Sequence, residues 1–260
     1  MVDRTDPERP DKSFGLYRRR VRLRATPWRA SADVEDDYHR FGVDVEHDGA
    51  VVLAIRGRAL RTPWTTCPLA AQQLQVLAGA PLLASPFQVL RQTKLAQHCT
   101  HMVDMAALAI AAAARGERYR QYDASLTLED RGGADWRTGV LEPSDGEPSR
   151  WLMRDGVVVE PAAYAGLEMR RAASWIAARS DTISAIEAAF VMQRAVLVAG
   201  GRRYELDEVV TPAAQLWMLG ACFAFQPDRM AEGRRRLGST RSFLRSEDLL
   251  ADLDGPQTPS

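Results

Sequence analysis

The sequence predicts an α+β fold, in which an antiparallel sheet built from two batches of strands packs against helices and the C-terminal third is helical. Two observations lead to this class. Segments that alternate with period two fall into two batches, one before residue 62 and one between residues 117 and 160. Segments with apolar residues three and four positions apart lie between these batches and after the second one.

The chain has 260 residues, 46% of them hydrophobic, which is enough to bury one sizeable core. We expect a single compact domain over residues 14–250. Residues 14–160 would hold the sheet and two central helices, and residues 161–250 would be mostly helical. The Pro-rich, charged ends, residues 1–13 and 251–260, lack periodicity and are predicted to be disordered.

The first batch begins with residues 16–26, which alternate like a strand. Residues 38–60 predict a β-hairpin, because apolar residues recur on one face and Asp48-Gly49 supplies the turn. Residues 67–79 have helical spacing, with Pro68 in the first turn and glycine at the end. A long apolar helix over residues 98–114 then follows an irregular connection.

Strand patterns return after this helix, and helical spacing returns after the strands. Strands are expected within three segments: residues 117–130, 136–142 and 150–160. Helices are expected at three further places: residues 161–179, 182–199 and 212–225. The amphipathic helices of this region make a homodimer plausible.

Composition limits the classes of partner and location. Lys+Arg and Asp+Glu both number 34, so charge gives no reason to expect nucleic acid as a partner. No run reaches the roughly 20 apolar residues of a membrane span, so no membrane is expected. The N-terminus lacks the apolar core of a signal peptide, which favours the cytoplasm. Three cysteines, an odd number, argue against a disulfide framework.

Two histidines and a cysteine gather at the start of the apolar helix. On a helix, His98 and His101 share a face with Asp104, an arrangement that suits a metal ion or a proton relay. The structural alternative is that His98 or Thr100 caps the helix. Both interpretations stay open at this point.

Two other clusters are candidates for the walls of a site. Residues 61–68 form a loop stiffened by two prolines that carries Arg61, Trp64, Thr65 and Cys67. Residues 35–41 combine three acids with a phenol and an imidazole before an apolar strand, and the acids are expected to be a solvated edge. Tyr38 and His39 would face opposite sides of the strand, so at most one of them points into a given cavity.

The residues 62–79, followed about thirty positions later by residues 98–109, resemble a bacterial family catalogued as domain of unknown function 2889. Its signature corresponds here to Cys67-Pro68 and to Cys99-Thr100-His101, and the resemblance covers roughly residues 16–115. It implies an intracellular bacterial protein encoded among genes for the degradation of aromatic or other hydrophobic molecules. Some relatives look like lyases that release formaldehyde from lignin-derived phenolics without a cofactor.

This resemblance implies a cofactor-independent lyase that acts on a phenolic aromatic and breaks a carbon–carbon bond of its substituent in a retro-aldol manner. Such chemistry needs a base, a cation for the developing oxyanion and an apolar slot. The expected catalytic residues are His101 as leading base, Arg61 as leading cation, His39 and Tyr38. The expected substrate contacts are Trp64, Trp28, Thr65, Phe41, Met102, Arg40, Cys67 and Cys99, and no metal is expected.

Two alternatives belong to other classes. A zinc-dependent hydrolase would use Cys67, Cys99, His98 and His101 as ligands, although such mixed sets are typical of closed structural sites. A non-catalytic protein that binds a hydrophobic small molecule would show an apolar pocket on which no base and cation converge. Signatures for nucleotide or flavin cofactors are missing from the sequence.

Overall fold

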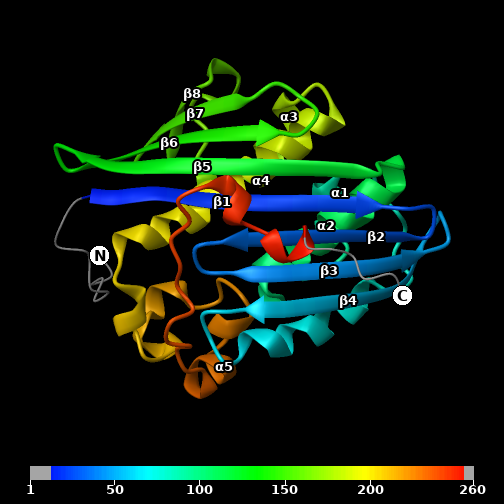
Figure 1. Ribbon diagram of the computed structural model, residues 1–260, viewed down its shortest axis with the longest axis horizontal. Coiled ribbons are helices and arrows are strands. Elements are labelled where there is room, and N and C mark those ends of the chain that lie inside the picture. The colour runs from blue at the N-terminus through cyan, green and yellow to red at the C-terminus, as the bar shows by residue number, and fades with distance from the viewer. Residues whose placement is uncertain (1–12, 255–260) are drawn as a thin grey trace.

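The computed structural model describes residues 13–254, and of residues 13 and 172–174 only the backbone. Eight strands form one antiparallel sheet in the order β4-β3-β2-β1-β5-β6-β7-β8 (Figure 1). The strands are β1 (Ser13–Ala25), β2 (Arg29–Asp36), β3 (Arg40–His47), β4 (Val52–Arg61), β5 (Tyr119–Arg131), β6 (Ala134–Pro143), β7 (Ser149–Arg154) and β8 (Val157–Glu160). The predicted α+β class is confirmed, and the two batches join where β1 pairs with β5.

The sequence patterns missed some of the ordered residues. Strand β2 was not predicted: its residues do alternate, but two of its three apolar residues are alanine, which is depleted in strands, and it carries Asp33, Glu35 and Asp36. Residues 251–254 were expected to be disordered, but they lie in the short turn of 3-10 helix η11 (Ala251–Leu253) and the residue after it. Ser13, also expected to be disordered, begins β1. The other residues of the predicted disordered ends, 1–12 and 255–260, lie outside the described residues.

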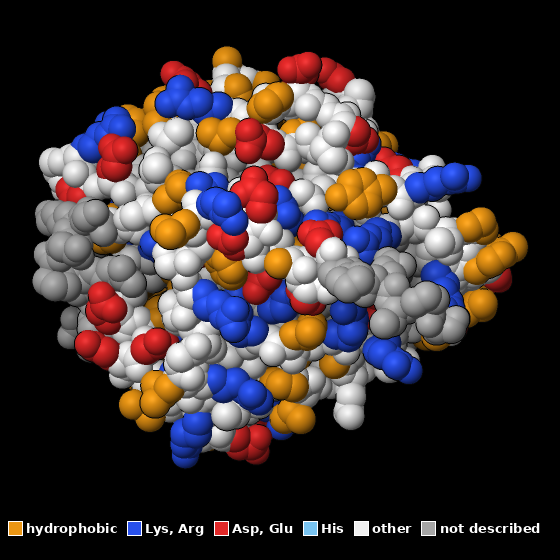
Figure 2. Space-filling view, viewed as in Figure 1, with side chains coloured by type: hydrophobic (Ala, Val, Ile, Leu, Met, Phe, Trp, Pro, Cys, Tyr) orange, Lys and Arg blue, Asp and Glu red, His pale blue; other side chains and the backbone are white. Residues whose placement is uncertain are grey.

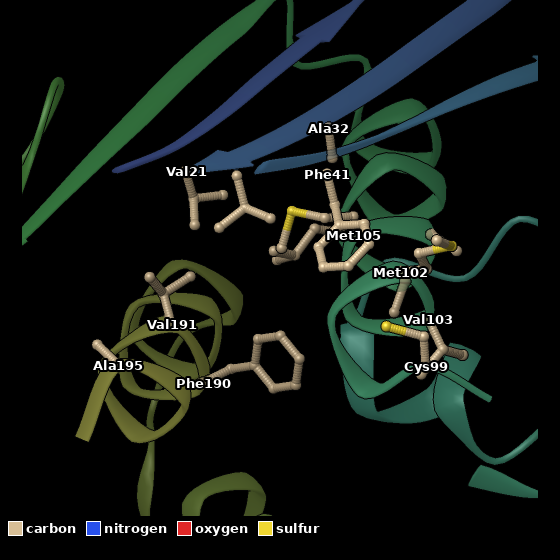
Figure 3. Close-up of a cluster of buried hydrophobic side chains, with 14 of the residues drawn as sticks. Val21, Ala32, Phe41, Cys99, Met102, Val103, Met105, Phe190, Val191 and Ala195 are labelled. Atoms are coloured by element: carbon tan, nitrogen blue, oxygen red, sulfur yellow. The ribbon is translucent and has the colours of Figure 1, made fainter. Parts of the chain in front are cut away.

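The inner face of the sheet is apolar and carries the core. Alternate residues of β1 to β3 point inward and are buried, among them Val21, Ala32 and Phe41. Two helices cover this face: α2 (Thr100–Arg115) and α4 (Ile183–Ala199). Figure 3 shows Phe41 of β3 beside Met105 of α2, with the α4 side chains of Phe190 and Val191 facing the same interior. Helix α2 forms readily because alanine dominates it, and it ends at Gly116, whose φ of 67° suits a left-handed cap.

The remaining helical segments differ from the predicted ones in kind more than in place. Residues 67–79 form a 3-10 helix, η1 (Cys67–Leu77), beside β4, and α4 confirms the helix predicted over residues 182–199. Residues 212–225 hold only short 3-10 turns, and residues 161–179 hold two such turns before α3. Gly166 and Gly220, with φ of 82° and 76°, interrupt these two segments.

The short helical elements are as follows. They are α1 (Pro86–Leu90), η2 (Leu95–Gln97), η3 (Ala162–Tyr164), η4 (Met169–Arg171), α3 (Ala172–Arg179), η5 (Gly200–Arg203), η6 (Leu206–Glu208), η7 (Pro212–Ala214), η8 (Leu216–Met218), η9 (Phe223–Phe225), α5 (Pro227–Glu232) and η10 (Ser246–Asp248). The last third of the protein is therefore irregular between α4 and α5. Single turns replace the helix expected there over residues 212–225.

The outer face of the sheet carries charged groups and is crossed by residues 236–254, which we call the C-terminal arm. The arm runs in front of β1 and β2 (Figure 1). On this side of the molecule, basic and acidic side chains lie interspersed (Figure 2). Asp252 pairs with Arg40 at 2.8 Å and Asp254 with Arg22 at 2.6 Å. The arm is thus bound to strands that precede it by more than 200 residues.

One segment, Ile183–Arg203, is long and apolar enough to cross a membrane by composition. It comprises α4 and η5, and 56% of its most apolar stretch is buried inside the protein. Helix α4 packs against β5 and β6. This is the packing of a core helix in a soluble protein.

Candidate functional site

The inner face of the sheet holds a buried polar cluster at the end of β2, centred on Asp36. Its Oδ1 accepts hydrogen bonds from the backbone N–H groups of Tyr38 and His39, both at 2.9 Å, and from the His39 Nδ1 at 3.0 Å. Its Oδ2 accepts from the Arg19 Nη1 at 2.6 Å. An aspartate that accepts from the second and third following residues fixes a tight turn, so the sequence Asp-Asp-Tyr-His itself sets this geometry.

Asp36 is fully buried and stays ionised. Burial alone would raise the pKa of its carboxyl, but the His39 imidazole, Arg19 and His101 outweigh that effect and hold the pKa well below its usual range. An ionised carboxylate only accepts hydrogen bonds. The Nδ1 of His39 must therefore be the donor.

The hydrogen bond to Asp36 fixes the orientation of the His39 imidazole. With Nδ1 bearing the proton, the lone pair of the neutral ring lies on Nε2. The imidazole is 13% exposed, and Nε2 is not among the buried nitrogens that lack a partner. Asp36 and His39 together form the arrangement in which a carboxylate fixes the tautomer of a general base.

His101, in the first turn of α2, lies against His39. The two ring centroids are 3.8 Å apart with 30° between the planes, and Phe41 stacks on His101 at 5.6 Å. Burial lowers the pKa of His101 well below its usual value, and His39 and Arg19 lower it further. His101 is therefore neutral near pH 7. Its Nε2 is buried and has no hydrogen-bond partner among the described residues.

Two groups of β1 lie behind Asp36. Arg19 is 1% exposed, and its positive charge balances the aspartate. Tyr17 is also fully buried; burial and then Asp36 raise the pKa of its phenol well above the usual value, so it stays protonated. Both residues point inward because β1 alternates, with Tyr17, Arg19, Val21 and Leu23 on one face.

A second ion pair closes the cluster on the helix side. Asp104 of α2 lies 2.8 Å from the Nε of Arg194 on α4. Burial raises the pKa of Asp104, and Arg194 opposes that rise. This pair joins the two helices that cover the sheet.

Several of the predicted site residues meet in this cluster. His39, His101 and Phe41 stack together, and the Tyr38 ring meets His39 edge-on with centroids 6.0 Å apart. Met102 is fully buried in the adjoining core. The sequence missed Asp36, Arg19 and Tyr17, although the inward alternation of β1 and the Asp-x-x-His spacing were signals that point to them.

Arg61, the predicted oxyanion partner, instead donates hydrogen bonds to backbone carbonyl oxygens. Its Nη2 donates to the carbonyl oxygens of Asp36 and His39, and its Nη1 donates to those of Asp37 and Ser239. The guanidinium thus holds the β2–β3 turn and the C-terminal arm together. Because both terminal nitrogens are committed to the protein, the geometry does not favour Arg61 as a substrate contact.

Four other predicted contacts lie away from the cluster. Arg40 points to the outer face, where it binds Asp33 and Asp252. Trp28 is 64% exposed in the turn between β1 and β2, at the opposite end of β2 from Asp36. Trp64 packs edge-on against Phe225, and exposed Thr65 bonds to Arg234. The stiff loop therefore packs on the C-terminal region instead of lining the histidines.

The cysteines form a separate buried group. Cys67 begins η1 and Cys99 is the N-cap of α2, as predicted, and these two elements contact each other. Burial raises the pKa of Cys99 well above its usual value, and the thiols of Cys67 and Cys222 raise it further. Neither His98 nor Thr100 caps α2, because its N-cap residue is Cys99 and no side chain makes a capping hydrogen bond. The His98 Nε2 instead lies 2.6 Å from the Thr93 hydroxyl.

Within residues 13–254, one group of potential metal ligands converges: Asp36, His39 and His101, with ligand atoms within 4.8 Å of one another. The zinc set of two cysteines and two histidines is not such a group. Imidazoles bind a metal through lone pairs in the ring plane, whereas the stacked rings here present theirs side by side. The neighbouring Arg19 adds unfavourable positive charge. The arrangement suits hydrogen bonding and proton transfer better than metal binding.

Comparison with protein-family models, curated proteins and solved structures finds no match to this protein. These comparisons therefore supply no activity for the fold or for the cluster. The proposal below starts from the chemistry that Asp36, His39 and His101 can perform.

Proposed function

We propose that the protein is a cofactor-independent lyase that releases formaldehyde from a phenolic aromatic, with His39 as general base in place of His101. The observation that carries the proposal is the hydrogen bond from His39 Nδ1 to the fully buried Asp36. The substrate class is supported by the resemblance to the domain of unknown function 2889 family. A phenolic substrate would suit this site because aromatic rings surround His39.

His39 would act through Nε2. It takes the proton of the hydroxymethyl O–H, the bond between the hydroxymethyl carbon and the carbon that bears it breaks, and formaldehyde leaves. The electron pair of that bond stays on the second carbon, delocalised into the conjugated system. The imidazolium formed on His39 then gives its proton to this second carbon, which gains a C–H bond, so no oxidant or reductant is required. Asp36 stabilises the imidazolium and keeps its ring in place.

His101 would be a neutral stacking partner for His39. Its lowered pKa makes it a poor proton acceptor near pH 7, although its buried Nε2 is available as a hydrogen-bonding atom. Phe41 and Tyr38 are buried beside the base and make its surroundings aromatic. These contacts support an aromatic substrate over an aliphatic one.

The test is formaldehyde release from a panel of lignin-derived phenolic dimers. His39→Ala should lower turnover about a hundred- to ten-thousand-fold, the usual contribution of a positioned general base. The matched control is His47→Ala, which removes a buried histidine at the far end of β3. The proposal fails if both variants, shown to be folded by circular dichroism, keep the turnover of the parent protein.

A non-catalytic binding protein is the second candidate, because only 13% of the His39 imidazole is exposed and His101 is mostly enclosed. In that case phenolic ligands would raise the melting temperature while no formaldehyde appears with any of them. Turnover by the parent protein excludes this candidate.

We also propose a cytoplasmic location. All three cysteines are free, and Cys67 and Cys99 lie near each other without forming a disulfide. Unpaired neighbouring thiols are typical of a reducing compartment. Fractionation of cells that express a tagged form tests this, and recovery from an oxidising compartment would contradict it.

A further inference from the structure

A polar cleft of about 290 Å³ lies beside the β2–β3 turn, and His39 is not among its lining residues. It is formed by the turn, by η5 and η6, and by the start of the C-terminal arm. Its lining residues are Asp37, Tyr38, Arg202, Asp207, Thr240, Arg241 and Ser242. A cleft of this volume holds a ligand smaller than a typical drug molecule.

The floor of the cleft contains a carboxyl oxygen that lacks a donor. Asp37 is 1% exposed, and one of its oxygens, Oδ2, accepts from the Arg202 Nε at 2.7 Å. The other, Oδ1, is buried and has no hydrogen-bond partner among the described residues. A buried polar atom of this kind is costly unless a ligand or a proton satisfies it.

The other charges at the cleft are satisfied, with one exception. Arg202 also donates to the Phe14 carbonyl and to Ser242, and Asp207 accepts from Arg235 and Thr240. Arg241 is exposed, and no ion pair or hydrogen bond of its guanidinium is found within residues 13–254. Its backbone N–H donates to the Asp37 carbonyl at 2.7 Å, which ties this residue to the cleft.

We propose that the cleft binds a small organic monocarboxylate, held by the Arg241 guanidinium and by a hydrogen bond from the Asp37 carboxyl group in its protonated form. Once Asp37 is protonated, the arginines that line the cleft outnumber its charged acids, so an anion is favoured over an amine. Asp207, 46% exposed at the rim, would repel a dianion such as phosphate. This site is independent of the proposed lyase chemistry, because it uses neither His39 nor His101.

Protonation of Asp37 is accessible near neutral pH. Burial raises the pKa of Asp37 to about 7, against the lowering effect of Arg202, while Asp36 raises it and Arg61 lowers it. Asp207 and Arg241 are the other charged groups at the cleft. Carboxylate binding should therefore weaken as pH rises through 7, by about ten-fold between pH 6 and pH 8, because each bound anion requires one proton on Asp37.

Isothermal titration of the full-length protein at pH 6 with benzoate, benzamide, benzylamine and inorganic phosphate tests the site. Benzoate should bind saturably at one site, and the other three should bind at least ten-fold more weakly. Arg241→Gln should weaken benzoate binding about ten-fold or more, as expected for loss of a charge-assisted hydrogen bond. The matched control is Arg245→Gln, an exposed arginine of the same arm that does not line the cleft.

Asp37→Asn tests whether the pH dependence of binding comes from the proton on Asp37 or from a general effect of charge. The amide N–H₂ donates at every pH, so this variant should bind benzoate equally at pH 6 and pH 8. The proposal is overturned by any of three results: no saturable benzoate binding, benzylamine or phosphate binding more tightly than benzoate, or an unchanged affinity in Arg241→Gln. Formaldehyde release is measured separately, so a failure here leaves the lyase proposal standing and the reverse also holds.

Discussion

Two consecutive aspartates in the β2–β3 turn have pKa values that move in opposite directions. Asp36 receives two backbone donors, the His39 ring and Arg19, and stays ionised. Asp37 has Arg202 as the only donor to its carboxyl group within the described residues, and burial dominates. The number of donors, more than depth, separates the two residues, because both are 1% exposed or less.

Asp37 should make the fold less stable as pH rises. Its pKa is raised from 3.8 to about 7, so its contribution to stability is complete below pH 4 and is lost as pH rises through 7. Between pH 5 and pH 8 this loss is about 2 kcal/mol. Urea denaturation at both pH values should show that Asp37→Asn loses less stability than the parent protein. The exposed Asp228→Asn is the control, and equal pH dependence in all three proteins would contradict the prediction.

The cysteines should be inert in the native protein. Burial, and then Cys222, raise the pKa of Cys67 to about 12, and the pKa of Cys99 is raised as well. Because the thiolate is the reactive form, both should react with a disulfide reagent at pH 8 only when the protein unfolds. Absorbance should report three fast thiols in concentrated urea and at most one, the partly exposed Cys222, without it. Rapid modification of all three in the folded protein would refute this.

Single residues show why part of the candidate site was not predicted. Glu35, Asp36 and Asp37 were expected to be solvated, yet all are buried, because their partners Arg61, Arg19 and Arg202 come from other elements. Local patterns cannot show such partners. The pairing of His39 and His101 was within reach, since each occupies the inward face of a recognisable element, but their contact depends on how α2 crosses the sheet.

At the scale of elements, the C-terminal arm replaces a second layer of helices on the outer face. Leu249 and Leu250 of the arm are fully buried, and the Leu250 N–H donates to the Glu35 carboxylate at 2.8 Å. Apart from β2, the strands could be predicted, as could the helices α2 and α4, because their periodicity is strong. The arm could not, because its residues have no period and are ordered by ion pairs with distant strands.

Leu249→Ala should therefore be costly although it lies close to the end of the described residues. Truncation of a fully buried leucine lowers the free energy of unfolding by about 2–5 kcal/mol. Leu244→Ala, in the same arm but 83% exposed, should change it by less than about 0.5 kcal/mol. Chemical denaturation of the three proteins gives the comparison, and a similar stability of both variants would show that the arm does not pack as described.

At the scale of the whole molecule, the sheet separates two kinds of interior. One face buries apolar groups with a few paired charges, and the other is a lattice of arginine–carboxylate pairs under the arm. The histidine cluster lies in the first, where desolvation keeps His101 neutral. Acid–base chemistry there needs no metal to lower a pKa.

Removal of metal should accordingly leave the protein unchanged. After dialysis against a strong chelator, the melting temperature and any formaldehyde release should match those of untreated protein, because the stacked rings and the neighbouring Arg19 disfavour a cation. Addition of zinc to the treated protein is the control. A loss of stability or turnover that zinc restores would instead assign Asp36, His39 and His101 as ligands.

The arm also orders events in time. Arg20 bonds to the carbonyl of Leu249, a residue 229 positions later. At a ribosomal rate of about 5–20 residues per second, roughly 10–45 s pass between the synthesis of these two residues. During that interval the outer arginines and the Glu35 carboxylate have no arm to meet. The outer face of the sheet is thus left half covered until the arm, which follows β1 by more than 200 residues, has been made.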